Sequence, residues 1–303
     1  MGEKGILLVG LACLDIINIM ESFPEEDTDS RCREQHWQRG GNASNSSVVL
    51  SQLGVKCQYF GTLAKHRLSE FIKDDLDKHG VTVDNCVYHD NCTVPTSCVI
   101  VNASNGTRTI LHANKNLPEL KLEDFERLNP NLYSWIHFEG RNIEEVMKMI
   151  SFIEKFNNEQ SAKDRITISL EMEKPKANVH ELIHHGDVVF MSKDYAKYFG
   201  HSTAEEAINA FHPKLKKGAT LVCAWGDKGA WGSDGSDGNI YHSQAYPPDQ
   251  LLDTLGAGDT FNAGVICGLN QKQRLLEALT LGCKLAGRKC GLHGFDGVAT
   301  GFV

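Results

Sequence analysis

Short apolar runs alternate along this chain with longer stretches of helical periodicity. The apolar runs cover residues 6–9, 135–138, 166–170, 188–191 and 220–225. Residues 143–156, 204–215, 260–269 and 275–289 place apolar side chains at the spacing of one helix face. Strands that alternate with helices form βαβ units, and such units build a mainly parallel sheet with helices on both faces. The sequence therefore predicts an α/β fold.

A different residue pattern, typical of half-exposed strands, interrupts this alternation in the first third of the chain. Residues 31–38 have the pattern of a half-exposed strand, and the runs 95–101 and 107–112 flank the dipeptide Asn105-Gly106. Asn-Gly between two strand-like runs is a strong signal for an antiparallel hairpin. We therefore expect a small β appendage beside the main sheet, with strands from residues of about 13–38 and 93–113. The Gly-rich stretch 232–238 is expected to be a surface turn between strands.

The composition is typical of a folded protein that does not bind nucleic acid. Of 303 residues, 41% are hydrophobic and 23% are charged, which is close to the average of globular domains. The net charge is −8, from 31 basic and 39 acidic residues. No block of Lys and Arg is present that would follow a phosphate backbone or an anionic membrane surface. We expect neither nucleic acid nor a membrane as a partner.

The cysteines and the N-terminus indicate a cytoplasmic protein. The apolar run 5–9 is too short for a signal peptide, and no later run approaches the length of a membrane-spanning helix. The ten cysteines include no C-x-x-C pair. Reduced, buried thiols are therefore a better explanation than a zinc site or a disulfide framework.

The segment 253–259, Asp-Thr-Leu-Gly-Ala-Gly-Asp, carries the sharpest chemical signal. Gly256, Ala257 and Gly258 leave backbone N–H groups accessible at the start of a helix, where unpaired donors and the helix dipole favour an anion such as phosphate. Asp259 follows in the first turn, where a carboxylate can accept the proton of an attacking hydroxyl. The alternative is an ordinary glycine turn in which Asp259 only caps the helix.

A second glycine-rich segment, residues 39–45, precedes a helix expected at 46–53. Gly41 permits close backbone approach, and the side-chain amides of Asn42 and Asn45 offer donors and acceptors to a polyhydroxyl ligand. Asp15, just after the first expected strand, can accept two hydroxyl hydrogen bonds. Each residue has a plain alternative, namely a capped helix start for the Asn side chains and a turn for Asp15.

Together these motifs resemble the two signatures of the ribokinase family, the PfkB-type carbohydrate kinases. The family's N-terminal G-G-N and C-terminal D-T-x-G-A-G-D segments occur here in the same order. The resemblance extends from residue 4 to about residue 298 and is closest to the fructose kinases of animals. The segments that carry it are residues 37–45, 137–142, 171–175, 223–229 and 291–297.

This resemblance implies a single ribokinase-like kinase domain over residues 1–303, a three-layer αβα sandwich in which the β appendage is a lid. It implies transfer of the γ-phosphoryl group of ATP to the 1-hydroxyl of fructose. Asp259 would be the catalytic base, and Gly256, Ala257 and Gly258 would form the anion hole. The ketose would be held by Asp15, Gly41, Asn42, Asn45 and Asp259.

The resemblance also assigns residues to the nucleotide and to a second subunit. Gly226, Asp227, Lys228 and Gly229 would border ATP together with the anion hole. Arg108, on the hairpin, would reach the ATP phosphates, and its plain alternative is a solvated Arg on an exposed strand. Asp27 resembles an acidic residue that one subunit of a homodimer presents to the sugar site of its partner.

One departure from the family pattern concerns magnesium. Many members carry an N-x-x-E motif after the strand that ends here at Met191, whereas this chain has Ser192-Lys193-Asp194-Tyr195. We therefore expect Mg²⁺ to be held by ATP phosphates and water, with no direct protein ligand, because Mg²⁺ usually keeps several waters. A requirement for K⁺ stays open.

Other functions fit parts of the sequence less well. An NAD-dependent oxidoreductase would share the α/β sheet, but G-x-G-x-x-G is missing after the first strand and no P-loop motif occurs. A catalytically inactive sugar-binding protein is disfavoured because Asp259 follows an intact glycine segment. Among kinases, another ribokinase-type sugar or nucleoside kinase is the alternative.

Overall fold

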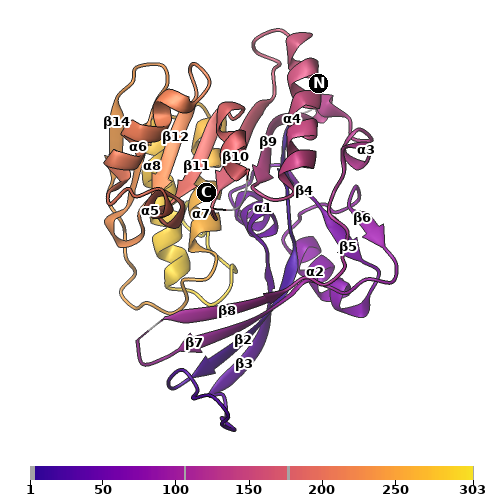
Figure 1. Cartoon of the computed structure of the whole chain (residues 1–303), viewed down its shortest axis with the longest axis vertical. Helices are drawn as coiled ribbons and strands as arrows, with labels where there is room; N and C mark the ends of the chain where they lie inside the picture. The colour runs from indigo at the N-terminus through magenta and orange to yellow at the C-terminus, as the bar shows by residue number, and fades with distance from the viewer. Residues whose placement is uncertain (1–3, 106, 176–177, 303) are drawn as a thin grey trace.

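The computed structural model describes residues 4–105, 107–175 and 178–302. Its largest sheet has eight strands in the order β14-β13-β12-β11-β10-β9-β1-β4 (Figure 1). Neighbouring strands from β12 to β4 are parallel, whereas β13 is antiparallel to both of its neighbours. The bounds are β1 Gly5–Val9, β4 Cys57–Phe60, β9 Tyr133–Glu139, β10 Thr167–Met172, β11 Val188–Ser192, β12 Thr220–Ala224, β13 Ala230–Ser233 and β14 Ile240–Ser243. The mainly parallel sheet is as predicted.

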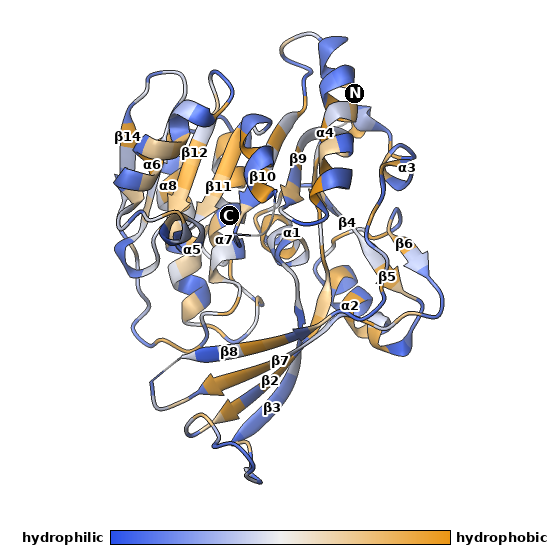
Figure 2. Cartoon of the chain, viewed as in Figure 1, coloured by the Kyte–Doolittle hydropathy of each residue, from blue (hydrophilic) through white to orange (hydrophobic). Residues whose placement is uncertain are grey.

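Alternate side chains of the central strands enter two separate cores. In β1, Ile6 and Leu8 pack into one core, while Leu7 packs into the other. The first core includes residues of α1 (Asn42–Gln52), α2 (Arg67–Lys78), α7 (Ala257–Asn270) and α8 (Leu275–Cys290), and the second includes residues of α4 (Ile143–Asn158), α5 (Lys193–Tyr198) and α6 (Ala204–Phe211). Figure 2 shows strongly hydrophobic strands at the centre of this body. A sheet buried on both faces requires helices on both sides, which gives three layers.

A second sheet of four strands projects from the body, and we call it the lid sheet (Figure 1). Its order is β3 (Glu34–Gly40), β2 (Cys13–Met20), β7 (Thr96–Asn102) and β8 (Arg108–Ala113). β7 and β8 pair antiparallel, as predicted for the hairpin, although Gly106 of the expected turn lies outside the described residues. β8 is exposed along its whole length.

Shorter elements complete the chain. They are the parallel pair β5 (Thr62–Ala64) and β6 (Val87–His89), helix α3 (Leu122–Phe125), and the 3₁₀ helices η1 (Pro130–Leu132), η2 (Val179–His184), η3 (His212–Lys214) and η4 (Gly226–Lys228). Of the surface turn predicted at 232–238, residues 234–238 lie between β13 and β14, whereas residues 232 and 233 are buried in β13. The ten cysteines are free thiols, but not all are buried as expected, because Cys32 and Cys98 are exposed. Within the described ranges, no helix combines the length and the apolar character needed to cross a membrane.

Several predicted boundaries differ from the structure. The helix expected from residue 46 begins at Asn42, so Asn42 and Asn45 both lie on α1. The helix expected to reach residue 215 ends at Phe211 and continues as η3, because Pro213 has no N–H for the helical ladder. The strand expected from residue 31 begins at Glu34, and residues 31–33 are exposed.

Candidate active site

The segment 253–259 leads into helix α7, as predicted. Gly256 has a φ of 78°, in the left-handed region, and is the N-cap residue of α7. The N–H of Ala257 donates to Thr254 O at 3.3 Å, so this amide is engaged in the turn. The amides of Gly258 and Asp259 have no partner within the helix, because they belong to its first turn. A Cβ on Gly258 would meet open space, and both Gly256 and Gly258 line a cavity, so the start of α7 has room for an anion, as an anion hole requires.

Asp259 contacts the other glycine-rich segment. Its Oδ2 accepts a hydrogen bond of 2.7 Å from Asn45 Nδ2, and its backbone oxygen accepts one of 3.1 Å from Ser46 Oγ. The helix that carries Asn45 begins after Gly41, whose φ is 98°. A Cβ on Gly41 would collide with the Leu11 carbonyl oxygen, so glycine is required at this turn. The two motifs therefore form one site.

Carboxylates from the end of β10 complete the polar interior. Asn42 Nδ2 donates to Glu171 Oε2 at 3.1 Å and to Glu173 Oε2 at 3.0 Å. Asn262 Nδ2, on α7, donates to Glu171 Oε1 at 2.9 Å. Glu171 thus links α1 and α7 at the carboxyl end of a central parallel strand, which is where α/β sheets generally bind ligands.

Burial dominates the electrostatics of these carboxyl groups. It raises the pKa of Asp259 from 3.8 to about 7, and the Asn45 hydrogen bond opposes this rise. The charges of Glu173 and Glu139 push the same pKa upward. Burial also raises the pKa of Glu171 well above its usual range, and the charge of Asp259 adds to that effect. A carboxyl group with a pKa near neutrality is suited to general base catalysis.

Asp15 reaches the site from the lid sheet, where it lies within β2 and not in a turn. It is 6% exposed, and its Oδ1 accepts a hydrogen bond of 3.4 Å from Cys13 Sγ. Burial raises the pKa of Asp15, whereas hydrogen bonds from Ser97 and Cys13 lower it. A Cβ on Gly40 would collide with the Asp15 carboxylate, so the glycine of β3 leaves space for this side chain.

A cavity of about 460 Å³ unites most of the predicted residues. Its lining includes Asp15, Gly41, Asn42, Asn45, Arg108, Gly256, Gly258 and Asp259. Arg108 Nη1 donates to Thr254 Oγ1. The lid sheet therefore contacts the loop that leads into α7.

Other predicted residues are not in the cavity lining. Gly226, Asp227, Lys228 and Gly229 form the η4 turn after β12, whose last residue, Ala224, does line the cavity. Asp27 lies on the exposed segment between β2 and β3. Ala257 is also outside the lining. The contacts of these residues with a nucleotide or a partner subunit stay predictions.

Sequence reasoning missed several residues of the cavity. Glu139, Glu171, Glu173 and Asn262 line it, but they received no role from the sequence. A usable signal exists for Glu139 and Glu171, because each occurs at the end of an apolar run, where the carboxyl end of a strand meets ligands. Asn262 follows Asp259 by three positions, a spacing that places both on one helix face.

The sequence profile of the pfkB family carbohydrate kinases matches residues 3–297. The chain belongs to this family. The kinase is 49% identical to mouse ketohexokinase over 298 residues, which are 98% of this chain and 100% of the mouse protein. It is also 24% identical over 251 residues to a fructokinase of Rhizobium leguminosarum bv. trifolii, covering 78% of this chain and 73% of that protein.

Solved structures share the fold of this kinase. The ribokinase of Arabidopsis thaliana complexed with ribose and ATP superposes with a TM-score of 0.77 at 19% identity, covering 96% of this chain and 94% of that one. The ribokinase of Thermotoga maritima gives a TM-score of 0.78 at 18% identity, covering 98% of this chain and 96% of that one. The predicted ribokinase-like fold is confirmed.

Proposed function

We propose that this pfkB family kinase is a ketohexokinase that transfers the γ-phosphoryl group of ATP to the 1-hydroxyl of fructose. The observation that carries the proposal is the 2.7 Å hydrogen bond from Asn45 to Asp259, which joins the sugar segment to a carboxylate at the start of α7. The 49% identity with mouse ketohexokinase favours a ketose over other sugars. The products would be fructose 1-phosphate and ADP.

In the proposed reaction, O1 of fructose attacks the γ-phosphorus of ATP in line with the departing ADP. The O1–P bond forms while the bond from the γ-phosphorus to the β,γ-bridging oxygen breaks, and the O1 proton passes to Asp259. Burial raises the pKa of Asp259 to about 7. At neutral pH a fraction of the protein molecules therefore has an ionised Asp259 that can accept a proton. Amides at the start of α7 would stabilise the charge that develops on the phosphoryl group.

The sugar would lie between the lid sheet and α1. Asp15, Gly41, Asn42 and Asn45 line the cavity from these two sides. The Nδ2 of Asn42 is engaged by Glu171 and Glu173, which leaves its carbonyl oxygen to accept from a sugar hydroxyl. Asp15 would accept two hydroxyl hydrogen bonds.

ATP would lie over the start of α7, with Arg108 toward its phosphates and the η4 turn beside the nucleotide. Among the described residues, no group of three or more His, Cys, Asp or Glu is arranged to hold a metal ion. Glu171 and Glu173 do line the cavity, so the site fits a Mg²⁺ ion that keeps its waters and binds the phosphates directly. When bound, Mg²⁺ would neutralise phosphate charge. Assays with and without K⁺ decide whether K⁺ is also required.

We further propose a homodimer formed through the lid sheet. β8 is exposed along its whole length, and Trp37 and Leu111 are 48% and 60% exposed, which is the kind of sheet surface that a second chain covers. Asp27 would then approach the sugar of the partner subunit. Closure of the lid sheet over the sugar would exclude water from the reacting phosphate.

The free thiols favour a reducing compartment, so we propose that the kinase is cytoplasmic.

A coupled ADP-release screen over fructose, ribose, tagatose, glucose and adenosine tests the proposal. Fructose should be the best substrate, and NMR of the product should place the phosphate on carbon 1. A phosphate on carbon 6, or a preference for ribose or adenosine, would identify another ribokinase-type sugar or nucleoside kinase. Binding of sugar without turnover of any acceptor would identify an inactive sugar-binding protein.

A further inference from the structure

Phe295 lies against the loop of residues 253–258, which we call the anion-hole loop. It belongs to the segment after α8 and is 5% exposed. A Cβ on Gly256 would collide with Cζ and Cε1 of Phe295, so the edge of the ring contacts the backbone of the glycine that caps α7. The position of this ring therefore limits how closely the loop can approach the body.

Two buried cations flank the Phe295 ring. Arg39 Cζ and Lys289 Nζ each lie 5.4 Å from the ring centroid, within the range of cation–π attraction. Both side chains are almost fully buried, at 1% and 0% exposure. Arg39 Nε donates to Asp75 Oδ2 at 2.6 Å, and Lys289 Nζ donates to Asp253 Oδ2 at 2.7 Å. Each buried charge is therefore paired with a carboxylate.

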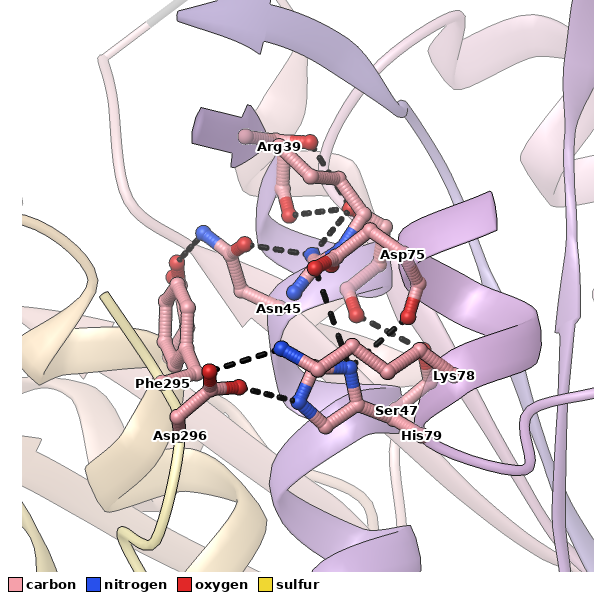
Figure 3. Close-up of polar contacts among 12 residues, drawn as sticks. Arg39, Asn45, Ser47, Asp75, Lys78, His79, Phe295 and Asp296 are labelled. Atoms are coloured by element: carbon pink, nitrogen blue, oxygen red, sulfur yellow. Dashed lines mark hydrogen bonds and ion pairs between the residues drawn. The ribbon is translucent and has the colours of Figure 1, made fainter. Parts of the chain in front are cut away.

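Lys289 contacts the start of the anion-hole loop directly, whereas Arg39 acts on Asp259 through Asn45. Lys289 Nζ donates to the backbone oxygens of Asp253 at 3.1 Å and of Leu292 at 3.4 Å, which ties the start of the anion-hole loop to the segment after α8. Arg39 Nη1 donates to Asn45 Oδ1 at 2.6 Å (Figure 3). Because the amide of Asn45 donates in turn to the base, Arg39 supports Asp259 through one intermediate.

The segment that carries Phe295 is fixed by side chains of two further helices. The carbonyl oxygen of Phe295 accepts from Gln52 Nε2 at 2.8 Å. Asp296 accepts from Lys78 Nζ at 2.7 Å and contacts His79 Nε2 at 2.9 Å, and Figure 3 shows both side chains directed at its carboxylate. The ring therefore cannot move away from Gly256 without breaking contacts to α1 and to the end of α2.

We infer that Lys289 and Phe295 are positioning residues for phosphoryl transfer, because together they hold the anion-hole loop where the developing phosphoryl charge is received. Neither residue lines the cavity in which the substrates would bind. The inference rests on the proposed phosphoryl transfer but not on fructose as its acceptor. Anion-hole stabilisation depends on the placement of donors, so a loosened loop lowers kcat while the substrates still bind.

The test compares Lys289→Met and Phe295→Leu with the control Lys284→Met. Lys284 is exposed on the same helix, and its Nζ also lies 5.4 Å from a ring centroid, that of Tyr246. The first two variants should lower kcat by about 10- to 100-fold. Their KM values for sugar and ATP should stay within about 3-fold of the parent values. Lys284→Met should match the parent protein in both parameters.

A transition-state mimic separates positioning from a general loss of structure. The affinity for fluoroaluminate in the presence of ADP and sugar should fall by the same factor as kcat, while the affinity for ADP alone is unchanged. Lys289→Met leaves the Asp253 carboxylate, which is 13% exposed, without its cationic partner, and this can prevent folding. The double variant Lys289→Met with Asp253→Asn removes both charges. Its kcat and its fluoroaluminate affinity can then be compared with the parent values without an unpaired charge in the protein. Circular dichroism selects the folded variants.

Two outcomes would overturn the inference. One is a folded Phe295→Leu or Lys289→Met protein whose kcat and fluoroaluminate affinity stay within about 2-fold of the parent. The other is an equal loss of kcat in Lys284→Met. If the parent protein phosphorylates a sugar other than fructose, the ketohexokinase proposal fails, and the same variants are compared on that sugar.

Discussion

Asn45 Nδ2 donates to Asp259 Oδ2 over 2.7 Å, while the Oδ1 of the same amide accepts from Arg39 at 2.6 Å. The amide orientation is therefore set by a buried cation on one side and a carboxylate on the other. A flipped amide would place its donors against the guanidinium of Arg39 and its oxygen against the carboxylate. Asn45 consequently supplies a fixed donor to the catalytic carboxylate, and this donor lowers the pKa that burial raises.

The first prediction concerns the pH dependence of kcat/KM. Asp259 must be ionised to accept the O1 proton, and burial raises its pKa to about 7. The value of kcat/KM should therefore fall as the pH drops below about 7 and approach a plateau above it. Asn45→Ala removes the hydrogen bond that lowers this pKa, so its acid limb should move to higher pH. Profiles of kcat/KM from pH 5 to 9 measure the acid limb of the parent protein and that of Asn45→Ala. Asn158→Ala, at an exposed position of α4, is the control. An unchanged limb in Asn45→Ala would contradict this account.

The second prediction concerns Arg108, which joins the lid sheet to the anion-hole loop through Thr254. Arg108→Ala should raise the KM for ATP by about 10-fold or more, because a charge-assisted bond to phosphate contributes about 1.5–3 kcal/mol. The KM for fructose should change much less. Arg127→Ala, on an exposed part of the body, is a matched control for the loss of one positive charge. Steady-state kinetics at varied ATP decide, and an unchanged KM for ATP would leave Arg108 as a link between lid sheet and loop only.

The sequence predicted the central strands well because they are buried on both faces. β1 and residues 188–191 of β11 are short apolar runs, and at this length such a run favours a buried strand over a helix. The start of α1 was misplaced because Asn, Ser and Ala at positions 42–47 give no apolar periodicity. That turn is helical because Gly41 takes a positive φ and the following small residues pack against the core.

The parts of the site that were missed depend on contacts between distant segments. Both glycine-rich motifs were identified from their local chemistry, but only the family resemblance, and no local pattern, brought Asn45 and Asp259 together across 214 positions. The role of Glu171 depends on Asn42 and Asn262, which come from two different helices. Likewise, the parallel pairing of β2 with β7 in the lid sheet joins strands far apart in the chain. A single sequence contains no local pattern that specifies these pairings.

The third prediction concerns the homodimer and Asp27. Sedimentation at micromolar concentration should give a dimer, and Asp27→Asn should lower kcat/KM for fructose while the dimer persists. Asn tolerates the φ of 61° at this position, so the exchange should leave the local backbone intact. Asp29→Asn, at a neighbouring exposed position, is the control. A monomer in the presence of ligands would rule out both the proposed interface and the role of Asp27.

The final prediction is that Asp259→Asn lowers kcat by at least about 10² while ATP and fructose still bind. The amide oxygen can still accept from Asn45, so the start of α7 keeps its shape, but an amide does not accept the O1 proton. Steady-state kinetics and calorimetry on the folded variant provide the measurement. Gly258→Val should instead weaken transfer by filling the open space beside the start of α7.

The same variant has an expected signature in stability. In the parent protein, the folded-state pKa of Asp259 is raised to about 7 from 3.8, so the folded state binds more protons than the unfolded chain between these values. The contribution of Asp259 to the free energy of unfolding is therefore present at low pH and is lost as the pH rises through 7. Asn does not titrate, so Asp259→Asn does not lose stability through this proton. The free energy of unfolding of the variant, measured in urea and compared with that of the parent, should therefore increase from pH 5 to pH 8. A variant with a kcat within a few-fold of the parent and no such pH trend would make Asp259 a helix cap and would refute its role as the base.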